Sequence, residues 1–181
     1  MSKSCIFCGE LGNISKEHFW PEWLAPYVHT IGDGHNISEL HSAEGKGQQT
    51  LQRRRVCPGN VITKKIRVVC KNCNNRWMSE LEANVKPTIL SLLINNKTAL
   101  TEEEVATLSL WITVKTIVGE HWEENLSLTP DNDRYLIYKN KIIPDYFHIF
   151  LGFHSFKNQA AYERQSTTVS YEVVAKVAII L

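Results

Sequence analysis

The chain has 181 residues, 43% of them hydrophobic, which is enough to bury one core, or one core plus a small metal-supported module. No apolar run is long enough to span a membrane and the N-terminus lacks the apolar core of a signal peptide, so we expect a cytoplasmic protein without a membrane partner. The net charge of +1 hides an asymmetry, because residues 46–76 hold nine basic residues and no acidic one, whereas the remainder holds 11 basic and 19 acidic residues. A basic segment on an acidic body is the pattern expected of a phosphate-binding surface.

Two matched cysteine pairs predict a metal site. Cys5 and Cys8 are separated by two residues, as are Cys70 and Cys73, and the second pair runs directly into a helical pattern. In a reducing compartment, paired C-x-x-C motifs bind metal more often than they form disulfides. Four thiolates complete a tetrahedral zinc site, whereas a redox pair or a chance burial of thiols explains only one of the two pairs well. The remaining cysteine, Cys57, is therefore expected to be a free thiol.

Between the two cysteine pairs, Glu17 and His18 precede an apolar stretch that contains Pro21. We interpret this segment as a short strand or turn that presents two polar side chains. By itself the pair is a weak signal, because a surface glutamate beside a half-buried histidine is a common arrangement. Its position between the two halves of a zinc site makes it a candidate functional site.

The long stretch from residue 24 to the second cysteine pair predicts a polar loop with a short hairpin. His29, His35 and His41 follow one another at intervals of six residues, which suit neither a helix face nor a strand face, so we expect solvated histidines rather than metal ligands. The strand edges that follow carry cationic side chains on their outer positions. The predicted nucleic-acid-binding residues are Arg53, Arg54, Arg55, Lys64, Lys65, Arg67 and Arg76.

A buried helix is expected at the start of the second half. The helix that follows Cys73 carries an apolar stripe and should bend or restart at Pro87. The next helix begins at Thr101, which forms a capping box with Glu104, and runs to about residue 122. Because it is apolar nearly all round, we expect it to be the buried spine, with Lys115 reaching solvent along its own aliphatic stem.

The last sixty residues change to the alternating pattern of strands. The expected strands are residues 135–138, 146–153 and 169–181, forming a small antiparallel sheet packed on the buried helix. The predicted fold class is α+β: residues 1–97 form a zinc-binding module, and residues 98–181 form an α/β C-terminal region with a helical spine and strands.

The runs EHFWPEWL and CKNCNNRWMSELE resemble the HNH, or ββα-metal, endonucleases, in the variant whose two strands and helix are held by a four-cysteine zinc. They are most similar to a group of bacterial and phage-borne HNH proteins. The resemblance covers roughly residues 1–97 and implies a treble-clef-like ββα-metal module. Glu17 stands where these proteins more usually have aspartate, and Lys65 where an asparagine is often found. The residues that carry the resemblance are Cys5, Cys8, Glu17, His18, Pro21, Cys70, Cys73 and Asn74.

Phosphodiester hydrolysis requires a base for the attacking water and a cation for the growing negative charge. His18 is the candidate base, because imidazole ordinarily titrates near neutral pH. A Mg²⁺ or Mn²⁺ ion requires oxygen ligands, which Glu17 and Asn74 offer, while zinc would be a structural ion. Glu80 and Glu82 could assist with the cation, but a solvated helix face is the favoured interpretation for both.

Two functions remain open from the sequence. The first is a metal-dependent endonuclease that cuts DNA, or RNA, with the basic segment gripping the phosphate backbone. The second is a catalytically inactive zinc-binding module that binds nucleic acid or protein, as in phage defence or counter-defence; a protein partner or a homodimer is open in either case. Glu17 and Lys65 favour the second. We favour the nuclease, because His18 and Asn74 supply a base and an oxygen ligand where the mechanism needs them.

Overall fold

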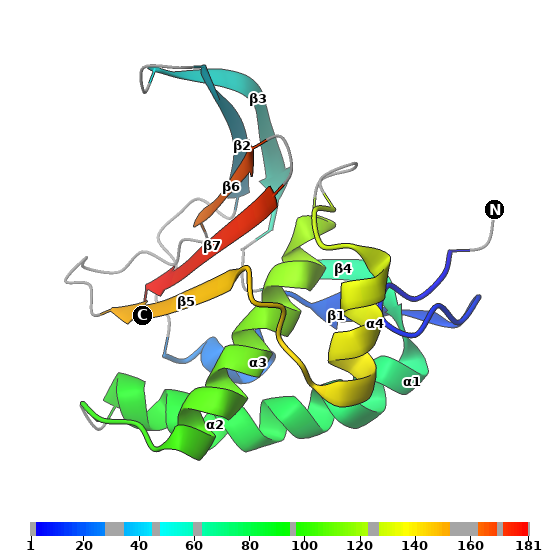
Figure 1. The fold of residues 1–181 in the computed structure, drawn as a ribbon, viewed down its shortest axis with the longest axis vertical. Coiled ribbons are helices and arrows are strands. Elements are labelled where there is room, and N and C mark those ends of the chain that lie inside the picture. The colour runs from blue at the N-terminus through cyan, green and yellow to red at the C-terminus, as the bar shows by residue number, and fades with distance from the viewer. Residues whose placement is uncertain are drawn as a thin grey trace.

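A computed structural model of the chain describes residues 3–27, 35–44, 48–59, 63–94, 97–122, 127–152, 163–169 and 172–180. The architecture mixes helices and strands, as the predicted α+β class requires (Figure 1). Three small sheets accompany the helices: β1 with β4, β2 with β3, and the order β5-β7-β6. Among the described residues, no helix is long and apolar enough to cross a membrane.

Two short antiparallel strands form the centre of the N-terminal half. β1 (Ile14–His18) pairs with β4 (Lys65–Cys70) so that the first residue of β1 lies opposite the last residue of β4. The register shifts between Ser15 and Glu17. Such a bulge changes the direction in which the following side chains point. The 3-10 turn η1 (Glu22–Leu24) follows β1.

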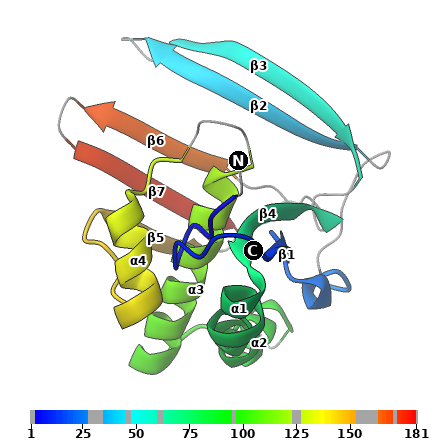
Figure 2. The same cartoon turned by 90° about the vertical axis from the view of Figure 1, so that its right-hand side faces the viewer.

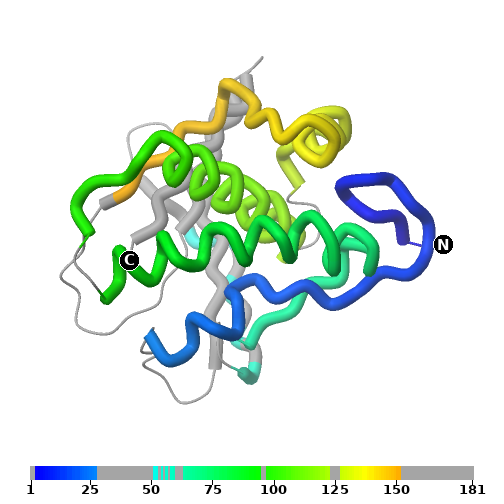
Figure 3. Tube along the Cα trace, turned by 90° about the horizontal axis from the view of Figure 1, so that it is seen from below, coloured from blue at the N-terminus to red at the C-terminus, as the bar shows by residue number. Residues whose placement is uncertain are grey.

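A continuous helical run follows β4 directly. It consists of α1 (Lys71–Cys73), the π-helical turn η3 (Asn74–Met78) and α2 (Ser79–Ile94). Pro87 lies inside α2, which continues through it and does not restart. Single π-helical turns inside helices are frequent at functional sites, and this one begins at a predicted catalytic residue. Figure 3 shows α2 running alongside the next helix of the chain, with which it is in contact.

That next helix, α3 (Glu102–Glu120), is the buried spine that its sequence predicts. The capping box is present, because the Glu104 side chain accepts from the Thr101 backbone N–H and the Thr101 hydroxyl accepts from the Glu104 backbone N–H. α3 contacts α2, β4 and β5, and its residues 111–120 are all buried. Lys115 is among them, so the expectation that its ammonium reaches solvent is wrong.

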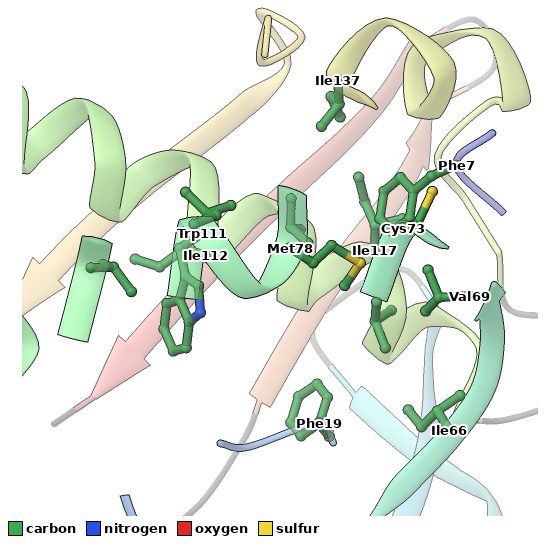
Figure 4. Close-up of a cluster of buried hydrophobic side chains, with 14 of the residues drawn as sticks. Phe7, Phe19, Ile66, Val69, Cys73, Met78, Trp111, Ile112, Ile117 and Ile137 are labelled. Carbon is green, nitrogen blue, oxygen red and sulfur yellow. The ribbon is translucent and has the colours of Figure 1, made fainter. Parts of the chain in front are cut away.

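One hydrophobic core joins the two halves of the chain (Figure 4). Side chains of the first cysteine pair, β4 and α2 pack with those of α3 and α4. Each aliphatic or aromatic side chain buried in this way contributes about 1.5–3 kcal/mol. Residues 1–97 and residues 98–181 therefore share buried contacts, and each region stabilises the other. Members that are almost wholly buried include Phe7, Phe19, Val69, Val85, Ile112, Ile117 and Ile137.

Helix α4 (Asp131–Asn140) occupies the segment in which residues 135–138 were expected to be a strand, and that expectation is wrong. Acidic residues in its first turn suit a helix start, and Lys141 ends it in the left-handed conformation at φ 59°. Ile137 points into the core, whereas Tyr135 remains exposed. Over four residues, the alternation of a strand cannot be distinguished from the apolar face of a helix, so the sequence pattern wrongly predicted a strand.

The C-terminal strands are β5 (Phe147–Gly152), β6 (Glu163–Val169) and β7 (Glu172–Ile180). β7 pairs antiparallel with β6 but parallel with β5. The sheet is mixed, so the expectation of an antiparallel sheet is wrong in this respect. The reason is the order of the strands. β7 lies between β5 and β6; it runs opposite to β6, which precedes it in the chain, and in the same direction as β5.

The predicted loop with a short hairpin contains a longer ribbon. β2 (His35–Glu44) pairs antiparallel with β3 (Gln48–Pro58), with a register shift after Leu40 that interrupts the alternation of the sequence. His41 lies in this ribbon, whereas His29 lies outside the described residues. Figure 2 shows the ribbon on the side of the molecule opposite α1 and α2.

Candidate functional site

The cysteine pairs come together at the end of β4. The Sγ atoms of Cys5, Cys8, Cys70 and Cys73 all lie within 4.8 Å of one another, and all four thiols are free. The Sγ atoms of Cys8 and Cys70 are 3.6 Å apart. Two sulfurs bound at about 2.3 Å to one tetrahedral zinc would be separated by about 3.8 Å, so the spacing suits a metal ion. The cluster can hold a metal, as the two C-x-x-C pairs predict.

Local backbone geometry explains how each pair forms its turn. In the first pair, the Gly9 N–H donates to the Cys5 carbonyl at 3.0 Å, and Gly9 has a φ of 75°, which a residue without a side chain adopts readily. In the second pair, the Cys73 N–H donates to the Cys70 sulfur at 3.4 Å, so Cys70 is also the N-cap of α1. Ile6 N–H donates to a β4 carbonyl and joins the two turns.

Four thiols at this spacing compete for protons. A hydrogen bond with Cys73 lowers the pKa of Cys5 to about 4, and the same contact raises the pKa of Cys73. Burial raises the pKa of Cys70 to about 11. A bound metal cation removes this competition, because it binds all four sulfurs as thiolates.

Aromatic side chains cover the cysteine cluster. The ring of Trp77 packs edge-on against Phe7 with centroids 5.2 Å apart, and it lies 5.9 Å from the ring of Tyr138. The Lys141 ammonium lies 4.1 Å from the Trp77 ring, and burial lowers the pKa of this lysine. Such a cover restricts water at the sulfurs, as expected of a structural metal site.

A second group of polar side chains surrounds a cavity of ≈ 400 Å³ beside β1. The three predicted catalytic residues, Glu17, His18 and Asn74, all line it. β1 and its bulge supply the first two, and the π-helical turn η3 supplies the third. Two residues that the sequence did not place there, Glu82 from α2 and Lys115 from α3, line the same cavity.

Glu17 is buried, with 6% of its surface exposed, and its charge is matched by a lysine from the spine helix. The Lys115 ammonium donates to Glu17 Oε1 at 2.6 Å and to the His18 carbonyl oxygen at 3.0 Å. It also lies 3.3 Å from Glu82 Oε2. A buried carboxylate requires such a partner. Glu82 is therefore not on a solvated helix face, and Trp23 Nε1 donates to its other oxygen at 3.3 Å.

His18 presents its imidazole to the cavity with 24% of the side chain exposed. Its Nε2 lies 2.8 Å from Glu22 Oε1, within ion-pair distance when the imidazole is protonated, and forms no other hydrogen bond among the described residues. His18, the base predicted from the sequence, lines the cavity, and sequence reasoning did not anticipate the neighbouring Glu22.

Asn74 is oriented by β1. Its Nδ2 donates to Ser15 Oγ at 3.0 Å, and that hydroxyl donates to the Val69 carbonyl oxygen at 3.1 Å. Because the amide nitrogen is used in this bond, the amide oxygen is the atom left for a ligand in the cavity. This short chain of hydrogen bonds could not be read from the sequence, because its partners come from three different elements.

The predicted nucleic-acid-binding residues lie in β3, in β4 and just before it, and in η3. Arg54, Lys65, Arg67 and Arg76 are exposed. Lys64 is half-buried, with its ammonium 4.5 Å from the centre of the Trp122 ring. The side chains of Arg53 and Arg55, and that of Cys57, lie outside the described part of the structure.

Comparison of the chain with protein-family models, curated proteins and solved structures finds no match. The fold and the two sites define a class of protein: a mixed helix–strand protein with a four-cysteine cluster that can hold a metal ion and an adjoining polar cavity. Its function must be argued from the chemistry of these two sites.

Proposed function

We propose that the protein is a metal-dependent endonuclease of the HNH type, which hydrolyses phosphodiester bonds in DNA. The observation that carries this proposal is the convergence of a buried carboxylate, an imidazole and an oriented amide on one cavity. These are Glu17, His18 and Asn74, which come from β1 and from the first turns after β4 (Figure 1). Phosphodiester hydrolysis needs a base and oxygen ligands for a cation in such proximity.

The cysteine cluster supplies the structural half of the proposal. Four sulfurs fill the coordination sphere of a tetrahedral Zn²⁺ and leave no position for a water nucleophile. The cluster joins the N-terminal turn to the start of α1, and β1 and η3 adjoin these two segments. A zinc ion bound by these four cysteines would therefore help to hold His18 and Asn74 across one cavity, although they are distant in the sequence.

His18 is the proposed general base. His18 lines the cavity, and an imidazole there would accept a proton from a bound water. The Lys115 bond to its backbone carbonyl fixes the main chain at this residue. Glu22, close to the ring, stabilises the imidazolium that forms after proton transfer.

The divalent cation, Mg²⁺ or Mn²⁺, would be held by the Asn74 amide oxygen and by Glu17, with water and phosphate completing its shell. When bound, it neutralises charge on the phosphate and on the departing oxygen. Glu82 lines the same cavity and adds a second carboxylate within reach. Exposed cationic residues of β4 and η3, such as Arg67 and Arg76, would bind the DNA backbone around the cavity.

The test is cleavage of supercoiled plasmid in Mg²⁺ or Mn²⁺ by purified, zinc-loaded protein. His18→Ala should lower the rate about 10²- to 10⁴-fold, the usual contribution of a positioned general base, without loss of zinc. The matched control is His148→Ala, which changes an exposed histidine on β5 and should cut at the wild-type rate. Absence of cleavage of DNA or RNA in either cation would contradict the proposal.

One observation favours the second candidate, a zinc-containing binding module without catalytic activity. Glu17 is already paired with the Lys115 ammonium at 2.6 Å, so the carboxylate does not need a divalent cation for charge balance. In this alternative the protein binds nucleic acid with wild-type affinity after His18→Ala and cuts nothing. The plasmid assay, combined with a binding measurement, separates the two candidates.

A further inference from the structure

Lys115 is a charged residue in the most buried part of α3. Residues 111–120 of this helix are all buried, and Lys115 itself is only 5% exposed. A buried ion pair is often no more stabilising than apolar residues of the same size. A lysine at this position therefore calls for an explanation other than stability, and its ammonium lies at the wall of the candidate site.

The surroundings of the ammonium favour protein groups over a substrate as its partners. Lysine has three N–H donors, and three oxygens surround Nζ at 2.6, 3.0 and 3.3 Å. These oxygens belong to Glu17, the His18 backbone and Glu82. Two donors are used in hydrogen bonds to Glu17 and the His18 carbonyl, and Glu82 pairs with the same ammonium, so a phosphate in the cavity would compete with these groups for Lys115. Its influence must pass through the groups that it holds.

We propose that Lys115 is a positioning residue that holds Glu17 and the His18 backbone and competes with the divalent cation for the Glu17 and Glu82 carboxylates. This inference depends on the proposed function for the place of the cation. The physical reason is charge: an ammonium already bound to Glu17 repels a second cation that approaches the same carboxylate in a region of low dielectric constant.

The competition has a consequence for substrate binding. In the free protein, Lys115 keeps the affinity for Mg²⁺ low, because it neutralises one of the two carboxylates. A phosphate that enters the cavity adds negative charge and restores the attraction for the cation. Cation binding and phosphate binding are then coupled, and each strengthens the other by the same factor.

The first test measures Mn²⁺ binding to zinc-loaded protein without nucleic acid, by electron paramagnetic resonance of the free ion. Lys115→Met should tighten Mn²⁺ binding by about tenfold or more, because it removes the competing charge. Lys115→Arg keeps the charge and should bind as the wild type does. Adding Glu17→Gln to Lys115→Met should abolish the gain. The matched control is Lys97→Met, which breaks the Lys97–Glu104 pair away from the cavity and should change nothing.

The second test measures wild-type protein and needs a variant only to assign one resonance. In protein labelled with ¹³C-lysine, Mg²⁺ should shift the Lys115 Cε resonance, which is assigned by its absence in Lys115→Arg. The midpoint of this shift should equal that of cation binding. A Lys115 resonance that stays unchanged while the cation binds would overturn the proposal, as would equal Mn²⁺ affinity in wild type and folded Lys115→Met.

The two proposals fail separately. Tighter Mn²⁺ binding in Lys115→Met, together with no cleavage by wild-type protein, would support the competition and refute the nuclease. Cleavage that depends on His18, together with Mn²⁺ affinity unaffected by Lys115→Met, would support the nuclease and refute the competition.

Discussion

The cysteine cluster and the polar cavity lie close to the same pair of strands, yet their chemistry is opposite. The cluster gathers four identical soft ligands from two local motifs and is covered by aromatic rings. The cavity gathers a carboxylate, an imidazole, an amide and an ammonium from β1, η3 and α3. A site whose four ligands one ion can satisfy suits a structural role, whereas a cavity that gathers an imidazole, a carboxylate and an amide suits chemistry.

The largest expected effect is the loss of stability when the cysteine cluster is disrupted and the cavity residues are left unchanged. Cys70→Ser should lose the metal and much of the stability, because the apparent free energy of binding a structural zinc, about 10–16 kcal/mol, is also folding free energy. Zinc content and the melting temperature of reduced protein measure this. The matched control is Cys57→Ser, which should keep zinc and melt near the wild-type temperature. Equal losses in both variants would show that Cys57 is a ligand.

A smaller effect is expected from breaking the charge balance of the cavity. Glu17→Gln leaves the Lys115 ammonium without its closest carboxylate, so the free energy of unfolding should fall by about 3–5 kcal/mol. Urea denaturation measures this value, and zinc content should not change. The double variant Glu17→Gln/Lys115→Met removes both charges and should recover most of the loss. If the double variant is as unstable as Glu17→Gln alone, the loss of stability comes from altered packing and not from an unpaired charge.

Substitutions in the basic segment should affect DNA affinity and leave the rate of cleavage unchanged. Replacing Arg53, Arg54 and Arg55 with glutamine should reduce the slope of log affinity for DNA against log salt by up to about 2.7, since each phosphate contact contributes about 0.9. The cleavage rate at saturating DNA should remain close to wild type. Filter binding at several salt concentrations gives the slope. An unchanged slope would place the DNA-binding surface elsewhere.

The smallest effect concerns the orientation of Asn74. Ser15→Ala removes the hydroxyl that holds the Asn74 amide, so stability should fall by about 1 kcal/mol and the cation concentration needed for half-maximal cleavage should rise severalfold. The control is Ser4→Ala, at an exposed position. If Ser15→Ala lowers stability without altering the cation requirement, then Asn74 is not a ligand.

The local features of this protein could be predicted from its sequence. The C-x-x-C pairs form turns through bonds such as Gly9 N–H to Cys5 O, and the capping box joins Thr101 to Glu104, three residues apart. The cysteine cluster, which can hold a metal ion, was predictable as well, because soft ligands of matched spacing have few other uses in a reduced protein. The convergence of His18 and Asn74 followed from the resemblance of two motifs, and the structure places both residues on one cavity.

Only the tertiary structure decided which residues complete the cavity and how the second half is arranged. Lys115 meets Glu17 across 98 residues of chain, and nothing in the apolar pattern of α3 indicates that partner. Glu82 turns toward the cavity because Trp23 and Lys115 both bind its carboxylate. The parallel entry of β7 beside β5 is equally non-local. Sequence patterns report the neighbours of a residue along a helix or strand, whereas burial of a charge and the order of strands depend on which elements the shared core brings together.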